Sequence, residues 1–272
     1  MSNNILLFGA AGRLGRISTK ALQTKGIKPV CYQRGLGFKI NSRITCDVDN
    51  PSALTGEWLV IDASVDYSSP VAFIDWESKK RQFVKMLYNS GRLHAYVSFS
   101  SGITEFDPSL IDDSFKEIYR REKQNLENFV INLLVPAYCP RIFTLIGRET
   151  WNFGRVGWVE VAKQIMQSGY AGVGFPDEKK SWVAETTIEK QLGDFVSGPV
   201  PWNFGVITPL DGIFTLRNIA EITATFFSKA YELEPLEIQR WLLTDYLSSI
   251  PHKYDLDMLS REIVQLIGNT SA

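Results

Sequence analysis

Short apolar runs alternate with longer amphipathic stretches along the first half of the chain. Residues 5–8 form an uninterrupted apolar run that ends at Gly9, as expected of a strand buried on both faces of a parallel sheet. Residues 16–25 have the apolar spacing of a helix, which Gly26 ends, and residues 29–32 form a second apolar run. The first three predicted elements are therefore strand, helix and strand.

The same alternation continues to residue 147. The next elements are predicted in the order strand, strand, helix, strand, helix and strand, at residues 43–46, 58–63, 71–88, 95–99, 115–131 and 137–146. Such alternation is typical of α/β proteins in which helices cover both faces of a parallel sheet. We therefore expect residues 1–147 to form a doubly wound parallel sheet.

The pattern changes after residue 147. Gly, Pro and Trp are frequent between short helical stretches up to residue 212, a helix is predicted at 216–227, and residues 236–266 are helical except at Pro251. We expect residues 148–272 to form mainly a smaller C-terminal lobe, with some segments returning to the N-terminal sheet.

A glycine-rich loop joins the first strand to the first helix. It contains Gly9, Gly12 and Gly15, with Arg13 and Leu14 between the last two glycines. Glycines at this junction let the backbone approach a pyrophosphate at the positive N-terminus of the helix. The position of the loop predicts a Rossmann-type dinucleotide-binding domain, and a tight turn without a ligand is the alternative.

The end of the second strand bears on the choice of cofactor. A carboxylate there would bind the ribose diol of NAD, but the strand ends in Tyr32-Gln33-Arg34. A guanidinium binds a 2′-phosphate in bidentate fashion, and Arg13 would add a second contact, so we expect NADP in preference to NAD. Two solvated surface arginines are the alternative. Asp47 and Val48 are candidates for the adenine edge and face, although Asp47 is equally suited to forming a turn.

Candidate catalytic residues follow the strand at 95–99. Ser100 and Ser101 come directly after it, at the carboxyl edge where ligands of this architecture bind. Tyr119 and Lys123 are four residues apart in a predicted helix, so their side chains project from one face. The pKa of a phenol is ordinarily about 10, but an adjacent ammonium favours the phenolate. Tyr119 is thus a candidate for proton transfer, and a solvent-exposed Tyr and Lys pair is the alternative.

With these motifs in this order, residues 5–227 resemble the short-chain dehydrogenase/reductase superfamily, especially its extended branch of sugar-nucleotide epimerases, dehydratases and reductases. The glycine spacing, the serines and the Tyr-x-x-x-Lys motif all match, and residues 140–147 look like the branch's Arg-Pro-x-Asn-x-Tyr-Gly segment. The resemblance implies that Ser101, or alternatively Ser100, hydrogen-bonds the reacting oxygen. It also implies that Tyr119 exchanges the proton and that Lys123 binds the nicotinamide ribose and lowers the Tyr119 pKa.

The resemblance also implies further contacts, with Ile142 beside the nicotinamide and Thr144 near the substrate. The cofactor-binding residues expected from motif and resemblance together are Gly9, Gly12, Arg13, Leu14, Gly15, Arg34, Asp47, Val48, Ala63, Ser64, Lys123 and Ile142. Substrate is expected to contact Ser100, Ser101 and Thr144.

The implied activity is hydride transfer on a nucleotide-activated sugar, as a reductase or a 4-epimerase. A dehydratase would need an extra acid beside the serine, but Gly102 and Ile103 follow Ser101. The chain departs from the family in having Thr144 in place of Asn and Thr187 in place of Asp. A reductase of another small carbonyl compound, and a catalytically silent dinucleotide sensor, are the alternatives.

Composition limits the partners. The 272 residues include 29 basic and 30 acidic side chains, so no overall field favours nucleic acid or an anionic membrane. Three cysteines and two histidines fit no metal site and suit a reducing, cytoplasmic compartment. No apolar stretch predicts a signal peptide or a membrane span. Related folds pair through the helices predicted at 71–88 and 115–131, so we expect a homodimer.

Overall fold

The computed structural model describes residues 4–41, 45–106, 108–111, 113–154, 156–198, 205–236 and 256–269. It contains two compact units, each assembled from separate segments of the chain. Unit 1 comprises residues 1–105, 114–141 and 188–208, and unit 2 comprises residues 106–113, 142–187 and 209–272.

Unit 1 is built on a large sheet with the strand order β12-β8-β6-β5-β1-β2-β3-β4, in which β7 also pairs with β8. These strands are β1 (Ile5–Phe8), β2 (Val30–Gln33), β3 (Gly37–Lys39), β4 (Thr45–Cys46), β5 (Trp58–Asp62), β6 (Leu93–Ser98), β7 (Ser100–Ser101), β8 (Ala137–Ile142) and β12 (Gly205–Ile207). Every neighbouring pair from β12 to β2 is parallel.

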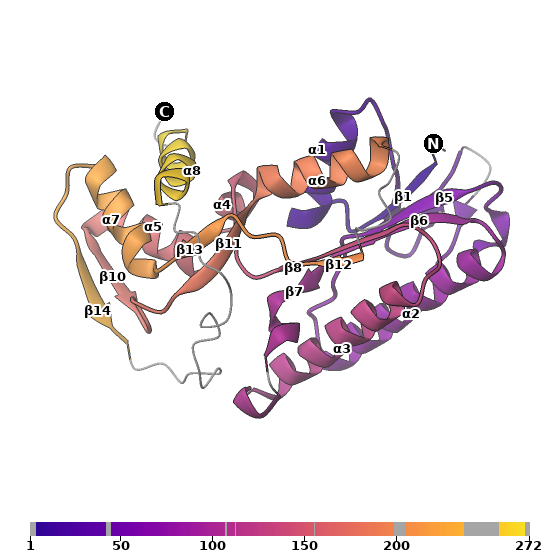
Figure 1. Cartoon of the computed structure of the whole chain (residues 1–272), viewed down its shortest axis with the longest axis horizontal. Coiled ribbons are helices and arrows are strands. Elements are labelled where there is room, and N and C mark those ends of the chain that lie inside the picture. Colours follow the sequence, from indigo (N-terminus) through magenta and orange to yellow (C-terminus); the bar gives the residue numbers. More distant parts are fainter. Residues whose placement is uncertain are drawn as a thin grey trace. The chain divides into compact units, whose positions relative to one another are not determined.

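Helices cover both faces of this sheet. Figure 1 shows α1 (Arg13–Gln23) and α6 (Glu185–Ser197) on one side, and α2 (Pro70–Asn89) and α3 (Ser114–Ile131) on the other. Short 3-10 turns η1 (Pro51–Ala53), η2 (Gly102–Glu105) and η3 (Pro108–Leu110) lie in the connections. The prediction of a doubly wound, Rossmann-type α/β fold is confirmed.

One edge of the sheet differs from the prediction. Residues 43–46 were expected to continue the parallel order, but Thr45–Cys46 pairs antiparallel with β3, which is itself antiparallel to β2; residues 42–44 lie outside the described part of the chain. Gly35 and Gly37 have φ values of 77° and 72°, a region that favours glycine, and they turn the chain back directly after β2. Because a hairpin replaces a crossover helix, the strand direction reverses, and the expectation of a parallel strand here is wrong.

The core of unit 1 lies between the sheet and helices α2 and α3. Leu6 and Phe8 are two residues apart in β1, so their side chains lie on the same face of the sheet, and both are fully buried. Phe83 and Leu87 of α2 are four residues apart and meet this face, as do Leu126 and Val130 of α3. The apolar run that predicted β1 and the helical spacing that predicted α2 and α3 therefore contribute to the same core.

Unit 2 contains the remaining elements. They are β9 (Leu145–Ile146), α4 (Arg148–Phe153), α5 (Gly157–Ser168), β10 (Tyr170–Val173), β11 (Lys180–Ala184), β13 (Gly212–Phe214), α7 (Leu216–Phe226), β14 (Glu232–Pro235) and α8 (Leu256–Gly268). Strands pair in the orders β13-β11-β9 and β10-β14. The predicted helix at 216–227 corresponds to α7, and the end of the one predicted at 236–266 lies in α8, whereas residues 237–255 are outside the described ranges.

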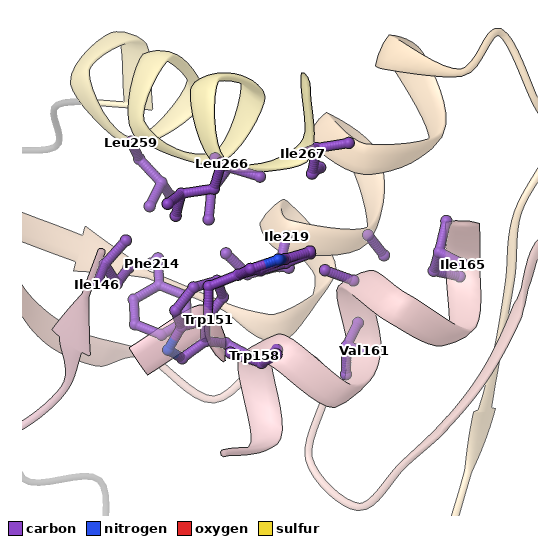
Figure 2. Packing of buried hydrophobic residues seen from close by; sticks show 14 of the residues in the cluster. Ile146, Trp151, Trp158, Val161, Ile165, Phe214, Ile219, Leu259, Leu266 and Ile267 are labelled. Carbon is purple, nitrogen blue, oxygen red and sulfur yellow. The ribbon is translucent and has the colours of Figure 1, made fainter. Parts of the chain in front are cut away.

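Buried aromatic side chains organise unit 2. Figure 2 shows Trp151 and Trp158 beneath Leu259 and Leu266 of α8. The two indole rings are 6.0 Å apart between centroids, and Trp158 Nε1 donates to the carbonyl of Leu145 at 3.2 Å. Within the described ranges, none of the helices is both long and apolar enough to cross a membrane.

Candidate active site

The glycine loop is packed tightly against the end of β5 and against itself. Gly9 has a φ of 75°, and a Cβ atom there would lie 2.7 Å from the carbonyl oxygen of Ala63 and from the Cα of Ser64. A Cβ on Gly15 would lie 1.9 Å from the carbonyl oxygen of Gly9, whereas one on Gly12 would be 3.4 Å from the same oxygen. The fold itself thus requires glycine at positions 9 and 15, but it has room for a side chain at position 12.

No side chain in the first turn of α1 neutralises the partial positive charge at the N-terminus of this helix. Gly12 is the N-cap residue, no side chain caps the helix, and the first turn contains no acidic residue. The half-buried Arg13 and Leu14 begin the helix. Because a helix N-terminus attracts anions, and because Gly12 leaves the backbone bare, this loop fits the pyrophosphate of a dinucleotide.

Arg34, the expected partner of a 2′-phosphate, pairs with Asp66 on the loop that follows β5. Hydrogen bonds from Ser68, and then from Arg34, lower the pKa of the Asp66 carboxyl to about 2. The Arg34 side chain is 75% exposed, but its guanidinium already has a carboxylate partner. A 2′-phosphate at this position would have to compete with Asp66 for Arg34 and would be repelled by its charge.

Asp47 and Val48 follow β4. The Asp47 Oδ1 atom accepts a hydrogen bond from the backbone N–H of Val48 at 2.6 Å, and Asn50 N donates to the Asp47 carbonyl at 3.2 Å. Val48 is 4% exposed and belongs to the core of unit 1. The structure therefore places Asp47 in a turn and the Val48 side chain in the core.

Ala63 and Ser64 lie beneath the glycine loop at the end of β5. Ser64 Oγ donates to Asp62 Oδ1 at 3.1 Å and accepts from the indole N–H of Trp76 at 3.0 Å. The Ser64 carbonyl accepts from Lys80 Nζ at 2.6 Å. These bonds fix the backbone on which Gly9 rests.

The two serines of β7 face different partners. Ser100 is buried, and its hydroxyl donates to Glu127 Oε1 at 2.5 Å. Ser101 is half-buried, its Oγ accepts from the backbone N–H of Ile103 at 3.3 Å, and its hydroxyl is close enough to Tyr119 to lower the pKa of that phenol. Successive residues of a strand point to opposite faces, so only one of the two hydroxyls reaches Tyr119.

Tyr119 and Lys123 lie together on α3. Lys123 is 3% exposed, its Nζ donates to the carbonyl of Phe99 at 3.1 Å, and it lies 5.6 Å from the centroid of the Tyr119 ring. Burial raises the pKa of Tyr119 above its ordinary value, and the neighbouring hydroxyls of Tyr67 and Ser101 and the charge of Arg13 offset this only in part. Ser101, Tyr119 and Lys123 are thus brought together, within electrostatic range of the glycine loop.

A buried charge network supports Lys123, and the sequence analysis missed it. Lys80 Nζ lies 2.8 Å from Asp62 Oδ2 and 2.9 Å from Glu77 Oε1, and all three side chains are at most 4% exposed. Burial alone would lower the pKa of Lys123, but the charges of Glu77, Tyr67 and Asp62 raise it overall. The ammonium of Lys123 is therefore held charged. The available signal was Asp62, a carboxylate that ends an otherwise apolar strand.

A second missed group lies one helical turn beyond Lys123. The Glu127 carboxylate accepts from Thr104 Oγ1 at 2.9 Å and from Arg141 Nε and Nη2 at 2.9 and 2.7 Å, in addition to Ser100. Arg141 also pairs with Glu105. This cluster ties the end of β8 to α3 and fixes the backbone on which Ser101 stands.

Ile142 and Thr144 belong to unit 2. Ile142 ends β8 and is half-buried, and the Thr144 carbonyl accepts from Val183 N at 2.9 Å. Thr144 lines a pocket of about 380 Å³ within this unit. The other residues around this pocket are Val156, Gly157, Trp158, Gly174, Phe175, Glu178, Lys180, Phe214 and Leu216. Thr187, the other departure from the family, donates from Oγ1 to Asp211 Oδ2 at 2.7 Å.

Comparison with known proteins bears on the fold. No family model matches the chain, and no curated protein does. Among solved structures, UDP-glucuronic acid 4-epimerase from Bacillus cereus, in complex with UDP-glucuronic acid and NAD, matches with a TM-score of 0.68 at 12% identity, covering 98% of this chain and 99% of that one. The chain has the fold of this enzyme.

Two further solved structures agree. MoeE5 in complex with UDP-glucose and NAD has a TM-score of 0.66 at 13% identity, with coverage of 99% of this chain and 100% of that one. TunA, an NAD-dependent NDP-hexosamine 5,6-dehydratase, has a TM-score of 0.64 at 14% identity, with coverage of 97% and 95%. At 12–14% identity these matches show the fold alone, and they agree with the predicted Rossmann-type α/β architecture.

Proposed function

We propose that this protein is an NAD(P)-dependent oxidoreductase or epimerase of a nucleotide-activated sugar. The observation that carries the proposal is the meeting of Ser101, Tyr119 and Lys123 in unit 1, beside a glycine loop that fits a pyrophosphate. The named similar structures are nucleotide-sugar enzymes with the same fold, which supports the choice of substrate class.

The chemistry follows from the positions of the side chains. The cofactor, when bound, would accept or donate the hydride. Ser101 would hydrogen-bond the reacting oxygen of the substrate, and Tyr119 would take up or return the proton of that oxygen. Lys123, held charged by Glu77 and Asp62, would stabilise the Tyr119 phenolate and bind the ribose of the nicotinamide.

The pocket of unit 2 is our candidate for the flat part of the substrate. Phe175 is half-buried and contributes aromatic surface to its wall, Trp158 and Phe214 are buried behind that wall, and the charged lining residues Glu178 and Lys180 pair with each other at 2.5 Å. An apolar, partly aromatic wall suits a planar base. We propose that the nucleotide base binds there, with Thr144 beside it.

The proposal extends to the cofactor, NAD or NADP, and to the oligomeric state. Asp66 already occupies Arg34, on which the expected NADP preference depends. Two of the solved structures named above hold NAD, so we propose NAD or NADP as the cofactor. Val71 of α2 and Ile131 of α3 are 67% and 65% exposed, which supports pairing of these helices in a homodimer.

The function can be tested by combining cofactor binding with turnover. Fluorescence titration with NADH and NADPH should show binding by wild type and equally by Tyr119→Phe, because the phenol is not part of the pyrophosphate site. Turnover of a panel of UDP-sugars should fall about 10²- to 10⁴-fold in Tyr119→Phe. Absence of cofactor binding, or a Tyr119→Phe variant as active as wild type, would overturn the proposal.

A further inference from the structure

Tyr67 lies directly beside Tyr119, on the loop between β5 and α2. The centroids of the two rings are 6.1 Å apart. The Tyr67 ring also stacks on Phe73 at 6.3 Å, with 8° between the planes, and meets the edge of Phe115 at 6.5 Å. Three aromatic contacts therefore hold this ring in place, so its hydroxyl has a defined position.

The hydroxyl of Tyr67 interacts with that of Tyr119. Burial raises the pKa of both phenols, and the interaction between the two hydroxyls raises the pKa of Tyr67 further while lowering that of Tyr119. Tyr67 is accordingly the donor when Tyr119 is a phenolate. Two hydroxyls, those of Tyr67 and Ser101, thus surround the oxygen that exchanges the substrate proton.

Tyr67 differs from the other groups around Tyr119 in its access to water. As a residue it is 61% exposed, whereas Ser101 is half-buried and Lys123 is 3% exposed. A phenol oxygen can accept one proton while its own proton leaves. A proton can therefore pass from Tyr119 through Tyr67 while Tyr67 itself stays neutral. The contact from Tyr119 to Tyr67 is therefore a path from the reacting oxygen toward solvent.

We propose that Tyr67 is a positioning and proton-relay residue, which hydrogen-bonds the Tyr119 phenolate and carries the substrate proton between Tyr119 and solvent. This inference rests on the proposed function. It adds to the Ser101, Tyr119 and Lys123 group a residue that the sequence motifs did not mark.

The proton balance of the reaction determines whether the path through Tyr67 is needed. In an oxidation the nicotinamide, when bound, would accept the hydride of the substrate C–H bond, and the O–H proton would pass to Tyr119. Tyr119 then gives that proton to the Tyr67 oxygen while the proton of Tyr67 leaves to water, which restores the phenolate. A reduction runs the same steps backwards. A 4-epimerisation returns the proton within one cycle and has no need of the path, so a dependence on Tyr67 indicates a net oxidation or reduction.

Tyr67→Phe tests the relay, because it keeps the ring and removes only the hydroxyl. We expect kcat to fall about 10²-fold with the affinity for NADH and NADPH unchanged, and we expect added imidazole to restore part of the rate. Imidazole should have no effect on wild type or on Tyr119→Phe. Tyr88→Phe, on the same α2 side of unit 1, is the matched control and should keep full kcat. Unchanged kcat in Tyr67→Phe, or a loss that imidazole does not restore, would overturn the relay.

A measurement without turnover separates this inference from the proposed function. The tyrosinate absorbance of wild type minus that of Tyr119→Phe, followed as a function of pH, gives the pKa of Tyr119. The same difference in the Tyr67→Phe background should show a higher pKa, because the phenolate has lost a donor. An unchanged pKa would refute the contact even if the enzyme is active. Conversely, a raised pKa in a protein that converts no UDP-sugar would keep the contact and remove the proposed function.

Discussion

The carbonyl oxygen of Gly9 lies 1.9 Å from the position that a Cβ atom on Gly15 would occupy. The loop therefore folds back onto the first turn of α1, so that α1 can begin only where residue 15 has no side chain. Gly12, between them, has no such constraint from the protein, since its nearest neighbour would be 3.4 Å from a Cβ.

Gly15→Ala and Gly12→Ala should therefore behave differently. Gly15→Ala is expected to lower the free energy of unfolding by about 2 kcal/mol or more, because backbone has to move to admit the methyl group. Gly12→Ala is expected to leave thermal stability nearly unchanged but to weaken NADH and NADPH binding, because its methyl group would lie in the proposed pyrophosphate site. Thermal denaturation and fluorescence titration measure the two effects. Equal destabilisation by both substitutions would contradict this account of the loop.

Glu77→Gln should reduce stability in a pH-dependent way. Burial alone would raise the pKa of Glu77, but Lys123 and Lys80 lower it overall in the folded protein. Its ionised form therefore adds stability above the unfolded pKa of about 4.3, and this contribution is lost as the pH falls through the lower folded value. We expect Glu77→Gln to cost about 3 kcal/mol at pH 7 and less at pH 4.

Urea denaturation at several pH values checks this expectation. Glu57→Gln is the control, because the Glu57 side chain is 63% exposed. It should change the free energy of unfolding by less than about 1 kcal/mol at any pH. A Glu77→Gln variant with the same pH dependence as wild type would show that Glu77 does not carry the charge assigned to it.

Glu127→Gln should destabilise far more than Glu117→Gln, although both carboxylates pair with an arginine. Glu127 is 6% exposed and accepts from three side chains, so its loss should cost about 3 kcal/mol. Glu117, which pairs with Arg120, is 34% exposed, and its loss should cost less than about 1 kcal/mol. Chemical denaturation gives the free energy of unfolding of both variants. Similar losses would mean that burial of Glu127 does not increase its contribution to stability.

Asp66→Asn should move the cofactor preference toward NADPH. The substitution removes the carboxylate that engages Arg34 and would repel a 2′-phosphate. We expect the ratio of NADPH to NADH affinity to rise about tenfold, since a charge-assisted hydrogen bond contributes about 1.5 kcal/mol. Asp75→Asn, an exposed position on α2, removes the same charge elsewhere and should leave the ratio unchanged. An Asp66→Asn ratio equal to that of wild type would show that Arg34 does not face the 2′ position.

The sequence by itself determined the features that depend on local pattern. The alternation of apolar runs and amphipathic stretches predicted the parallel strands and the helices on both faces of unit 1, because a strand buried on both faces is apolar throughout and a helix buried on one face repeats every three to four residues. The spacing of Gly9, Gly12 and Gly15 at a strand end, and of Tyr119 and Lys123 on one helix face, marked the candidate site for the same reason. Ser101 was distinguished from Ser100 only as a preference, since a shift of one residue reverses the direction of the side chain.

The tertiary structure alone decided what depends on contacts between distant residues. Tyr67 meets Tyr119, and Arg141 meets Glu127, because the sheet order places their elements together, and no local spacing encodes that order. The antiparallel turn of β3 after β2 was missed because Gly35 and Gly37 permit a hairpin without requiring one. Glu77 and Lys80 look like ordinary surface charges in the sequence, and only their burial against Asp62 shows that they set the charge around Lys123.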